Sequence, residues 1–190
     1  PLTTLVALEN TTNKGGGGCW DFSEIKKIKK VCEDHNLGFH LDGARLWNAL
    51  EVTKETPKDY GAVFDTISVC LSKGLGCPIG SVLIGDSVIM EKAIRIRKML
   101  GGGMRQVGVL AAAGLYALDH HRKRLSEDHQ KANEIGQILQ NKSYVAKLQP
   151  IETNILIFEL ASHINADQFV LNLEKKGVLI SNMGGGKLRM

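Results

Sequence analysis

The stretch that decides the fold is DTISVCLSKGLGCPIGS, residues 65–81. Residues 67–71 form a short apolar run bounded by turn signals, which is typical of a buried strand. The run stops at Lys73, which is followed at once by Gly74 and Gly76. Because lysine is among the residues least often fully buried, this pattern predicts an amine delivered to the end of a strand.

Strand and helix patterns alternate on both sides of this stretch, up to residue 85. Such alternation is typical of an α/β layer around a largely parallel sheet. Asp21 or Ser23 is expected to cap the first helix, which should end before Gly38. The strands expected in this part of the chain cover residues 2–8, 38–44, 66–71 and 79–85.

Four consecutive glycines, residues 15–18, interrupt this alternation. A P-loop would need a lysine followed by serine or threonine at a helix start, and that pattern is missing, so we expect a flexible connector. Residues 87–100 predict an amphipathic helix that ends at three glycines. The next helix, expected over residues 105–121, is apolar nearly all round and is therefore predicted to be buried or to face another subunit.

The last part of the chain predicts a separate small α+β unit. We place the first domain at residues 1–125 and the second at residues 126–190. The chain begins and ends inside strand patterns and lacks an initiator methionine, so we expect a fragment whose small domain is incomplete. The elements expected in the second domain are strands near 144–148, 153–160 and 177–181 and a helix near 165–176.

Composition argues against several classes of protein. Net charge is only +4, and no basic stripe is interleaved with aromatic residues, so nucleic acid is not an expected partner. The basic run at residues 26–30 has helical spacing and predicts a solvated helix face. No apolar stretch approaches the roughly 20 residues of a membrane span, and no signal-peptide pattern is present.

The four cysteines show no C-x-x-C pair and no zinc-ligand spacing. We therefore expect reduced thiols, no metal site and a cytoplasmic location, with disulfides as the weaker alternative.

The segment HLDGAR, residues 40–45, carries the first group of polar side chains. In a strand, His40 and Asp42 point to one face while the residues between them point to the other. A carboxylate at the carboxyl end of a sheet strand, followed by a glycine turn, lies where α/β proteins place ligands. A capping aspartate with Arg45 as its ion-pair partner is an equally open alternative.

Lys73 taken alone is best interpreted as an exposed loop lysine. Together, Lys73 and Asp42 at the ends of neighbouring strands suit pyridoxal 5'-phosphate, which needs a lysine for its aldehyde and an acid for its pyridine nitrogen. The lysine would form a Schiff base, and the neighbouring glycines would leave room for the cofactor. Arg45 would hold a carboxylate or the cofactor's oxygens as a forked donor.

Five segments of the sequence, taken in order, resemble the successive blocks of a known family. The chain resembles the low-specificity threonine aldolases, in the β-eliminating lyase group of fold-type-I pyridoxal-phosphate enzymes, which have an aspartate-aminotransferase-like fold. The short segment at residues 188–190 resembles a further block. The five segments are ENTTN (9–13), HLDGARLWNA (40–49), SVCLSKGLGCPIGSVLIG (68–85), RIRKMLGGGMRQVGVLAAAG (95–114) and RLSEDHQKA (124–132).

The resemblance implies residue roles. Lys73 would be the Schiff-base lysine, and Asp42 would bind the pyridine nitrogen. Arg45 would lie near the substrate carboxylate and the cofactor, and Arg189 would supply a second guanidinium for that carboxylate. The family usually reads Glu-Asn-Thr-His-Asn in its first block, whereas this chain has Thr12 at the histidine position.

The resemblance also implies a homo-oligomer, a dimer or tetramer. Lys98 and Arg105 flank the glycine turn at residues 101–103, a region that in this family lies at a subunit contact and approaches a neighbouring cofactor site. The alternative for both residues is a surface or interface ion pair.

The implied activity is that of a carbon–carbon lyase in amino-acid metabolism. It would cleave L-threonine or L-allo-threonine to glycine and acetaldehyde, a step of threonine catabolism and glycine biosynthesis. Another β-eliminating lyase or an amino-acid racemase on the same fold is the alternative within enzymes. An inactive remnant that does not bind the cofactor alone is the alternative outside them, because the family's phosphate cup and ring-stacking histidine come from an N-terminal part that this chain does not contain.

Overall fold

The computed structural model describes residues 2–190, which form two compact units. The first unit runs to Thr11 and resumes at Cys19–Leu125, and the second combines Thr12–Gly18 with Ser126–Met190. Among the described residues, no helix has both the length and the apolar content needed to cross a membrane.

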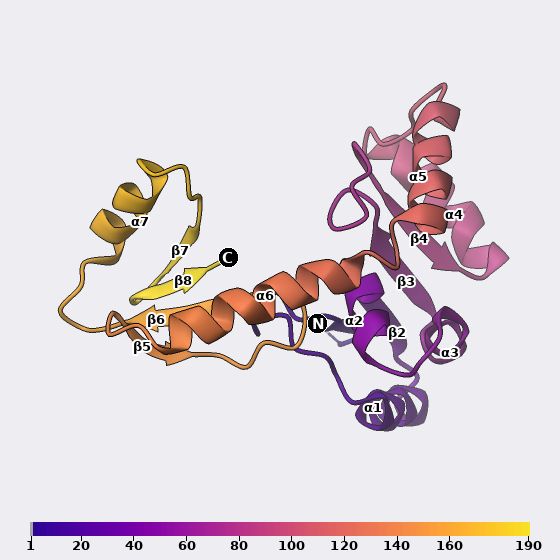
Figure 1. The fold of residues 1–190 in the computed structure, drawn as a ribbon. Helices are drawn as coiled ribbons and strands as arrows, with labels where there is room; N and C mark the ends of the chain where they lie inside the picture. The colour runs from indigo at the N-terminus through magenta and orange to yellow at the C-terminus, as the bar shows by residue number, and fades with distance from the viewer. Residues whose placement is uncertain (1) are drawn as a thin grey trace. The chain divides into compact units, whose positions relative to one another are not determined.

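The first unit is built on a four-stranded sheet in the order β1-β2-β3-β4 (Figure 1). Strands β1, β2 and β3 are parallel, whereas β4 is antiparallel to β3. The loop between β3 and β4 is shorter than the dozen or so residues of a parallel crossover, so the chain turns back instead. The strands are β1 (Leu5–Glu9), β2 (Gly38–Gly43), β3 (Thr66–Cys70) and β4 (Ser81–Gly85).

Helix α1 begins where the sequence predicts a cap. Of the two candidates, Asp21 is the N-cap, and its carboxylate accepts a hydrogen bond of 2.7 Å from the Ser23 amide. The helix ends before Asn36, whose φ is 53°, a value that asparagine tolerates better than most residues. The helices of this unit are α1 (Phe22–Asp34), α2 (Leu46–Val52), α3 (Pro57–Val63), α4 (Ser87–Met99) and α5 (Gly108–His120).

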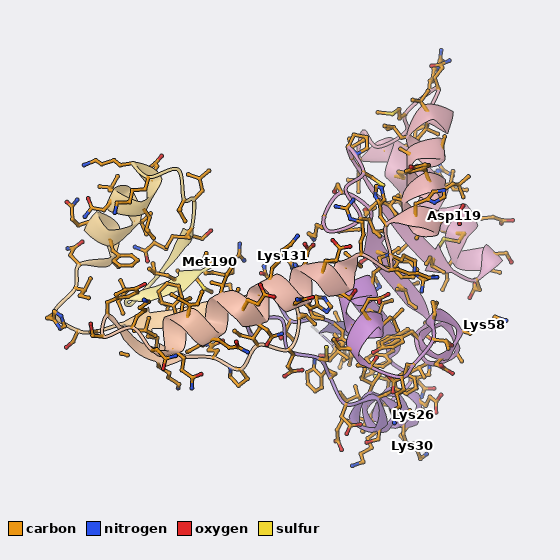
Figure 2. All side chains as sticks on the ribbon, viewed as in Figure 1. Lys26, Lys30, Lys58, Asp119, Lys131 and Met190 are labelled. Carbon is orange, nitrogen blue, oxygen red and sulfur yellow. The ribbon has the colours of Figure 1, made fainter. Side chains whose placement is uncertain are left out.

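The basic run on α1 is a solvated helix face, as predicted, except at Lys29, which is partly buried and pairs with Asp65 at 2.9 Å. Lys27 pairs with Glu24 at 2.6 Å and Lys30 with Asp34 at 3.0 Å, and these side chains are largely exposed. Lys26 and Lys30 are labelled on this helix in Figure 2. Exposed pairs of this kind contribute little to stability.

One face of the sheet is covered by a core to which α1, α2 and α3 each contribute. Along β2, Phe39 and Leu41 are buried, whereas Asp42 is exposed. The alternation leaves the polar side chains of the strands on the opposite face. The buried residues of this core are Leu8, Ile25, Cys32, Phe39, Leu41, Leu46, Tyr60, Phe64, Ile67 and Val69.

The prediction that the apolar helix is buried is wrong for the described residues. In α5 only Gly114 and Ala117 are buried, and Val109 and Tyr116 are 79% and 60% exposed. A helix that is apolar all round has no preferred side, and the fold packs it along a single line that includes Leu71 beside Gly114. Whether another subunit covers α5 stays a prediction.

The second unit is an α+β arrangement with an antiparallel sheet in the order β5-β6-β8-β7. Residues 177–181 were expected to be a strand, but Gly177 adopts a φ of 78° after the end of α7, a conformation typical of a helix stop. The elements of the second unit are β5 (Val145–Leu148), β6 (Ile157–Leu160), α7 (Ala166–Glu174), β7 (Ser181–Gly184) and β8 (Lys187–Arg189), together with most of α6 (Leu125–Gln140).

The four glycines form an ordered turn within this unit, so the expectation of a flexible connector is wrong. The two central glycines are buried and have φ values of 76° and 77°. The Gly17 amide donates to the Thr12 carbonyl at 2.8 Å, and the Thr153 hydroxyl donates to the Gly17 carbonyl at 2.7 Å. A Cβ on Gly17 would lie 2.5 Å from the Thr153 Oγ1 atom, so this position requires glycine.

Candidate active site

The polar edge of the first unit is formed by the carboxyl ends of its parallel strands. In the register of the sheet, Asp42 lies opposite Ser68 on β3. Lys73 follows the end of β3 by three residues. Because the carboxyl ends of parallel strands meet at one edge of a sheet, Asp42 and Lys73 come from neighbouring strands at the same edge.

Asp42 is held by the bend that follows β2. One carboxylate oxygen accepts a hydrogen bond of 3.1 Å from the Ala44 amide, and the side chain is exposed. A Cβ on Gly43 would lie 2.7 Å from the Ser68 carbonyl oxygen, so the chain can pass this close to β3 only with glycine. The bend thus fixes the carboxylate at the edge while leaving it open to solvent.

Arg45 immediately precedes helix α2 and is half-buried. In residues 2–190 no ion pair joins it to Asp42. The alternative of a capping aspartate with Arg45 as its partner is therefore only half met. Asp42 accepts a local hydrogen bond from the Ala44 amide, but it forms no ion pair with Arg45.

The bend that carries Lys73 is closed by backbone hydrogen bonds. The Gly76 amide donates to the Lys73 carbonyl at 2.8 Å, and the Cys77 amide donates to the Leu71 carbonyl at 3.1 Å. A Cβ on Gly74 would lie 2.7 Å from the Leu125 Cδ2 atom. The side of Gly74 on which a Cβ would lie is therefore filled by the buried Leu125, and the expectation that the glycines leave room for a cofactor stays a prediction.

Lys73 itself is exposed, and its Nζ atom lies 3.2 Å from the Cys70 Sγ atom. The sequence interpretation treated Cys70 only as a reduced thiol, and all four cysteines are free in the structure. The contact between these two side chains was not predicted from the sequence, although they are only three residues apart.

His40 occupies the face of the sheet that carries Asp42. Its Nδ1 atom lies 2.7 Å from the Thr66 hydroxyl oxygen on the neighbouring strand. Side chains alternate between the two faces along each strand. His40 and Asp42 of β2 therefore share one face of the sheet with Thr66, Ser68 and Cys70 of β3.

The remaining predicted site residues lie elsewhere in the chain. Lys98 is in the last turn of α4, Arg105 precedes α5, and both are exposed. In the described part of the chain, no hydrogen bond or ion pair links either of them to Asp42 or Lys73. Arg189 belongs to the second unit, where its Nη1 atom donates to the Asn13 side-chain oxygen at 2.6 Å.

Comparison with known proteins identifies the family. The protein-family model described as Beta-eliminating lyase matches residues 1–163 of the chain. The chain belongs to the beta-eliminating lyase family. The resemblance drawn from the five segments is thereby confirmed.

Several curated relatives of this family member are named as threonine aldolases. The chain is 38% identical to low-specificity L-threonine aldolase 1 of Arabidopsis thaliana, over 100% of this chain and 54% of the relative. It is also 38% identical to the low specificity L-threonine aldolase of Escherichia coli K12, over 94% of this chain and 52% of the relative. The chain therefore spans about half the length of the curated relatives it matches.

Solved structures confirm the fold class. A threonine aldolase from Leishmania major superposes with a TM-score of 0.75 at 20% identity, covering 98% of this chain and 55% of that one. A PLP-dependent aminotransferase from Streptococcus suis gives a TM-score of 0.73 at 16% identity, covering 99% of this chain and 52% of that one. At these identities the likeness shows the fold, and the chemistry has to be argued from the site.

The polar edge fits pyridoxal phosphate in the chemistry of its donor groups. The cofactor needs a primary amine for its aldehyde and a carboxylate for its ring nitrogen. Lys73 and Asp42 supply these two groups from adjacent strands, and both are exposed. Neither of them is engaged in an ion pair within residues 2–190.

Proposed function

We propose that the protein is a pyridoxal-phosphate-dependent threonine aldolase, a carbon–carbon lyase that cleaves L-threonine or L-allo-threonine to glycine and acetaldehyde. The single observation that carries the proposal is the position of Asp42 and Lys73 at one sheet edge of a chain that belongs to the beta-eliminating lyase family. The names of the curated relatives support the choice of substrate.

When bound, pyridoxal phosphate supplies an aldehyde for covalent attachment and a ring that takes up the electrons of the broken Cα–Cβ bond. Lys73 contributes its Nζ atom as the nucleophile, for which an exposed amine on a short bend is suited. Asp42 contributes a carboxylate that keeps a proton on the ring nitrogen, since a negative charge stabilises a cation beside it. The amide of Ala44 orients this carboxylate.

Two arginines are proposed to bind the substrate carboxylate, because a guanidinium matches a carboxylate with two parallel hydrogen bonds. Arg45 is close in sequence to Asp42, and its half-buried position favours a fixed orientation. Arg189 is oriented by Asn13 through a hydrogen bond of 2.6 Å. Lys98 and Arg105 are proposed to act at a subunit contact near a neighbouring cofactor.

We also propose a cytoplasmic homo-oligomer with two domains that divide near residue 125. The exposed apolar side chains of α5, among them Val109 and Leu115, support the oligomer. The free state of all four cysteines supports a reducing compartment.

The test is to incubate the purified chain with pyridoxal phosphate, reduce the mixture with borohydride and locate the adduct by peptide mass. We expect one dominant adduct at Lys73. Lys73→Ala should abolish it, and Lys58→Ala, which removes an exposed lysine on α3 (Figure 2), should leave it unchanged. Asp42→Asn should weaken labelling, because the amide oxygen can still accept from Ala44 but the negative charge is gone.

Uniform labelling of surface lysines, or none, would contradict cofactor binding by this chain and favour an inactive remnant. If Lys73 is labelled, product release should then be compared for threonine, allo-threonine, serine and aromatic amino acids. Cleavage of aromatic substrates with no acetaldehyde from threonine would favour another β-eliminating lyase, and inversion without cleavage would favour a racemase.

A further inference from the structure

The contact between Lys73 and Cys70 joins the site lysine to the last residue of β3. The Nζ atom donates to the Sγ atom at 3.2 Å, well within the range of a hydrogen bond to sulfur. In the part of the chain that the structure describes, Lys73 has no carboxylate partner. The thiol is thus the group that holds this otherwise exposed amine.

Cys70 lies on the face of the sheet that also carries Asp42, so its contact with Lys73 determines on which face the amine lies. Thr66, Ser68 and Cys70 alternate with the buried residues Ile67 and Val69. The 2.7 Å contact between Thr66 and His40 shows that this face of β3 continues into the face of β2 that carries Asp42. A lysine bound to the Cys70 sulfur is therefore held on the same face as the carboxylate.

We propose that Cys70 is the positioning residue for Lys73: its sulfur draws the amine onto the face of the sheet that carries Asp42. A free lysine side chain is one of the most mobile in a protein, and fixing it has a large entropic cost. Cys70 offsets that cost with a hydrogen bond formed before any ligand arrives. The role of this pair in cofactor attachment rests on the proposed function, whereas the hold of the thiol on the amine does not.

Two measurements on the same Cys70 variants test the thiol–amine contact and its role in cofactor attachment separately. The first uses no cofactor: a trace of isotope-labelled acetic anhydride acylates the amines, and peptide mass gives the labelling of Lys73 relative to Lys58. In Cys70→Ala the exposed amine loses its hydrogen-bond partner, so this ratio should rise about two- to threefold, the lower end of the range for one hydrogen bond, because sulfur is a weak acceptor. Cys70→Ser keeps an acceptor at the same place and should stay closer to the wild type.

The second measurement is borohydride trapping with pyridoxal phosphate. Here Cys70→Ala should lower the ratio of Lys73 to Lys58 labelling by a similar factor, because the amine is no longer held on the side of Asp42. Cys70→Ser should restore most of it. The matched control is Ser68→Ala, which removes a polar atom from the same face of β3 without touching the pair; both ratios should stay at wild-type values.

Opposite changes in the two ratios support a positioning role, because a change in folding or exposure would move both ratios in the same direction. An acylation ratio in Cys70→Ala equal to that of the wild type overturns the proposal, as do two ratios that rise or fall together. If the acylation ratio rises as expected but the wild type shows no preference for Lys73 with pyridoxal phosphate, the thiol–amine contact is supported and the proposed function fails.

Discussion

Gly17 allows the ordered glycine turn to be tested quantitatively. Its φ is 77°, and a Cβ there would lie 2.5 Å from the Thr153 Oγ1 atom and 3.2 Å from the Ile155 Cβ atom. Gly177 in the same unit has a φ of 78°, but nothing lies within 4 Å of its added Cβ. The two glycines therefore share one backbone conformation and differ in their surroundings.

Replacing each glycine by alanine separates these two contributions. In both variants the left-handed backbone conformation costs about 1–2 kcal/mol. Gly17→Ala adds an overpacking cost of about 1–3 kcal/mol. It also disturbs the hydrogen bond of Thr153, which is fully buried, for roughly a further 1 kcal/mol. We expect Gly17→Ala to destabilise the second unit by about 2–4 kcal/mol more than Gly177→Ala.

The assay is hydrogen exchange of the β6 and β8 amides, followed by mass spectrometry of peptides, which gives the free energy of opening of this unit. Both variants should open more readily than the wild type, and Gly17→Ala by far the more so. Equal opening free energies, within about 0.5 kcal/mol, would refute the argument and restore the flexible connector.

Three further predictions concern the first unit, whose unfolding is reported by the fluorescence of both tryptophans. Tyr60→Phe leaves the buried Asn10 amide without the 2.9 Å hydrogen bond to the tyrosine oxygen, so urea denaturation should show a loss of about 1–3 kcal/mol, with Tyr144→Phe as the control. Burial raises the pKa of Tyr60 from 10.0 to about 12. Between these pH values the folded chain keeps a proton that the unfolded chain loses, so the free energy of unfolding should fall as the pH rises. In Tyr60→Phe this fall should be less steep. Thr56→Ala removes the capping box that Thr56 forms with Asp59 at the start of α3, and the urea midpoint should drop by the equivalent of about 1 kcal/mol; an unchanged midpoint would contradict the role of the cap.

The strands and helices of the first unit follow from local patterns in the sequence. The alternation of buried Phe39 and Leu41 with exposed Asp42 is visible in the residues themselves, and Asp21 is a favoured capping residue. The direction of β4 does not follow from its own residues, because it depends on the length of the loop before it. Burial of α5 was mispredicted for a related reason. Hydrophobicity indicates which residues are able to be buried, whereas the packing of the folded chain determines which residues are buried.

Asp42 and Lys73 were predicted as a pair at one sheet edge, and the structure places their strands side by side. Their roles, and those of Arg45, Lys98, Arg105 and Arg189, stay predictions. The contacts that orient the side chains were beyond the sequence, since they join residues whose nearness depends on the folded backbone. The hydrogen bond between Asn13 and Arg189, which are 176 residues apart, is the clearest case.

The membership of the glycine turn in the second unit sets an order of events during synthesis. Gly17 leaves the ribosome well before its hydroxyl partner Thr153, which is 136 residues further along the chain. At a translation rate of about 5–20 residues per second, this interval is on the order of ten seconds. All four strands of the first unit, the last of which ends at Gly85, are synthesised before Thr153. Completion of the second unit is therefore a long-range closure, because the glycine turn cannot form its hydrogen bond to Thr153 until that residue has been synthesised.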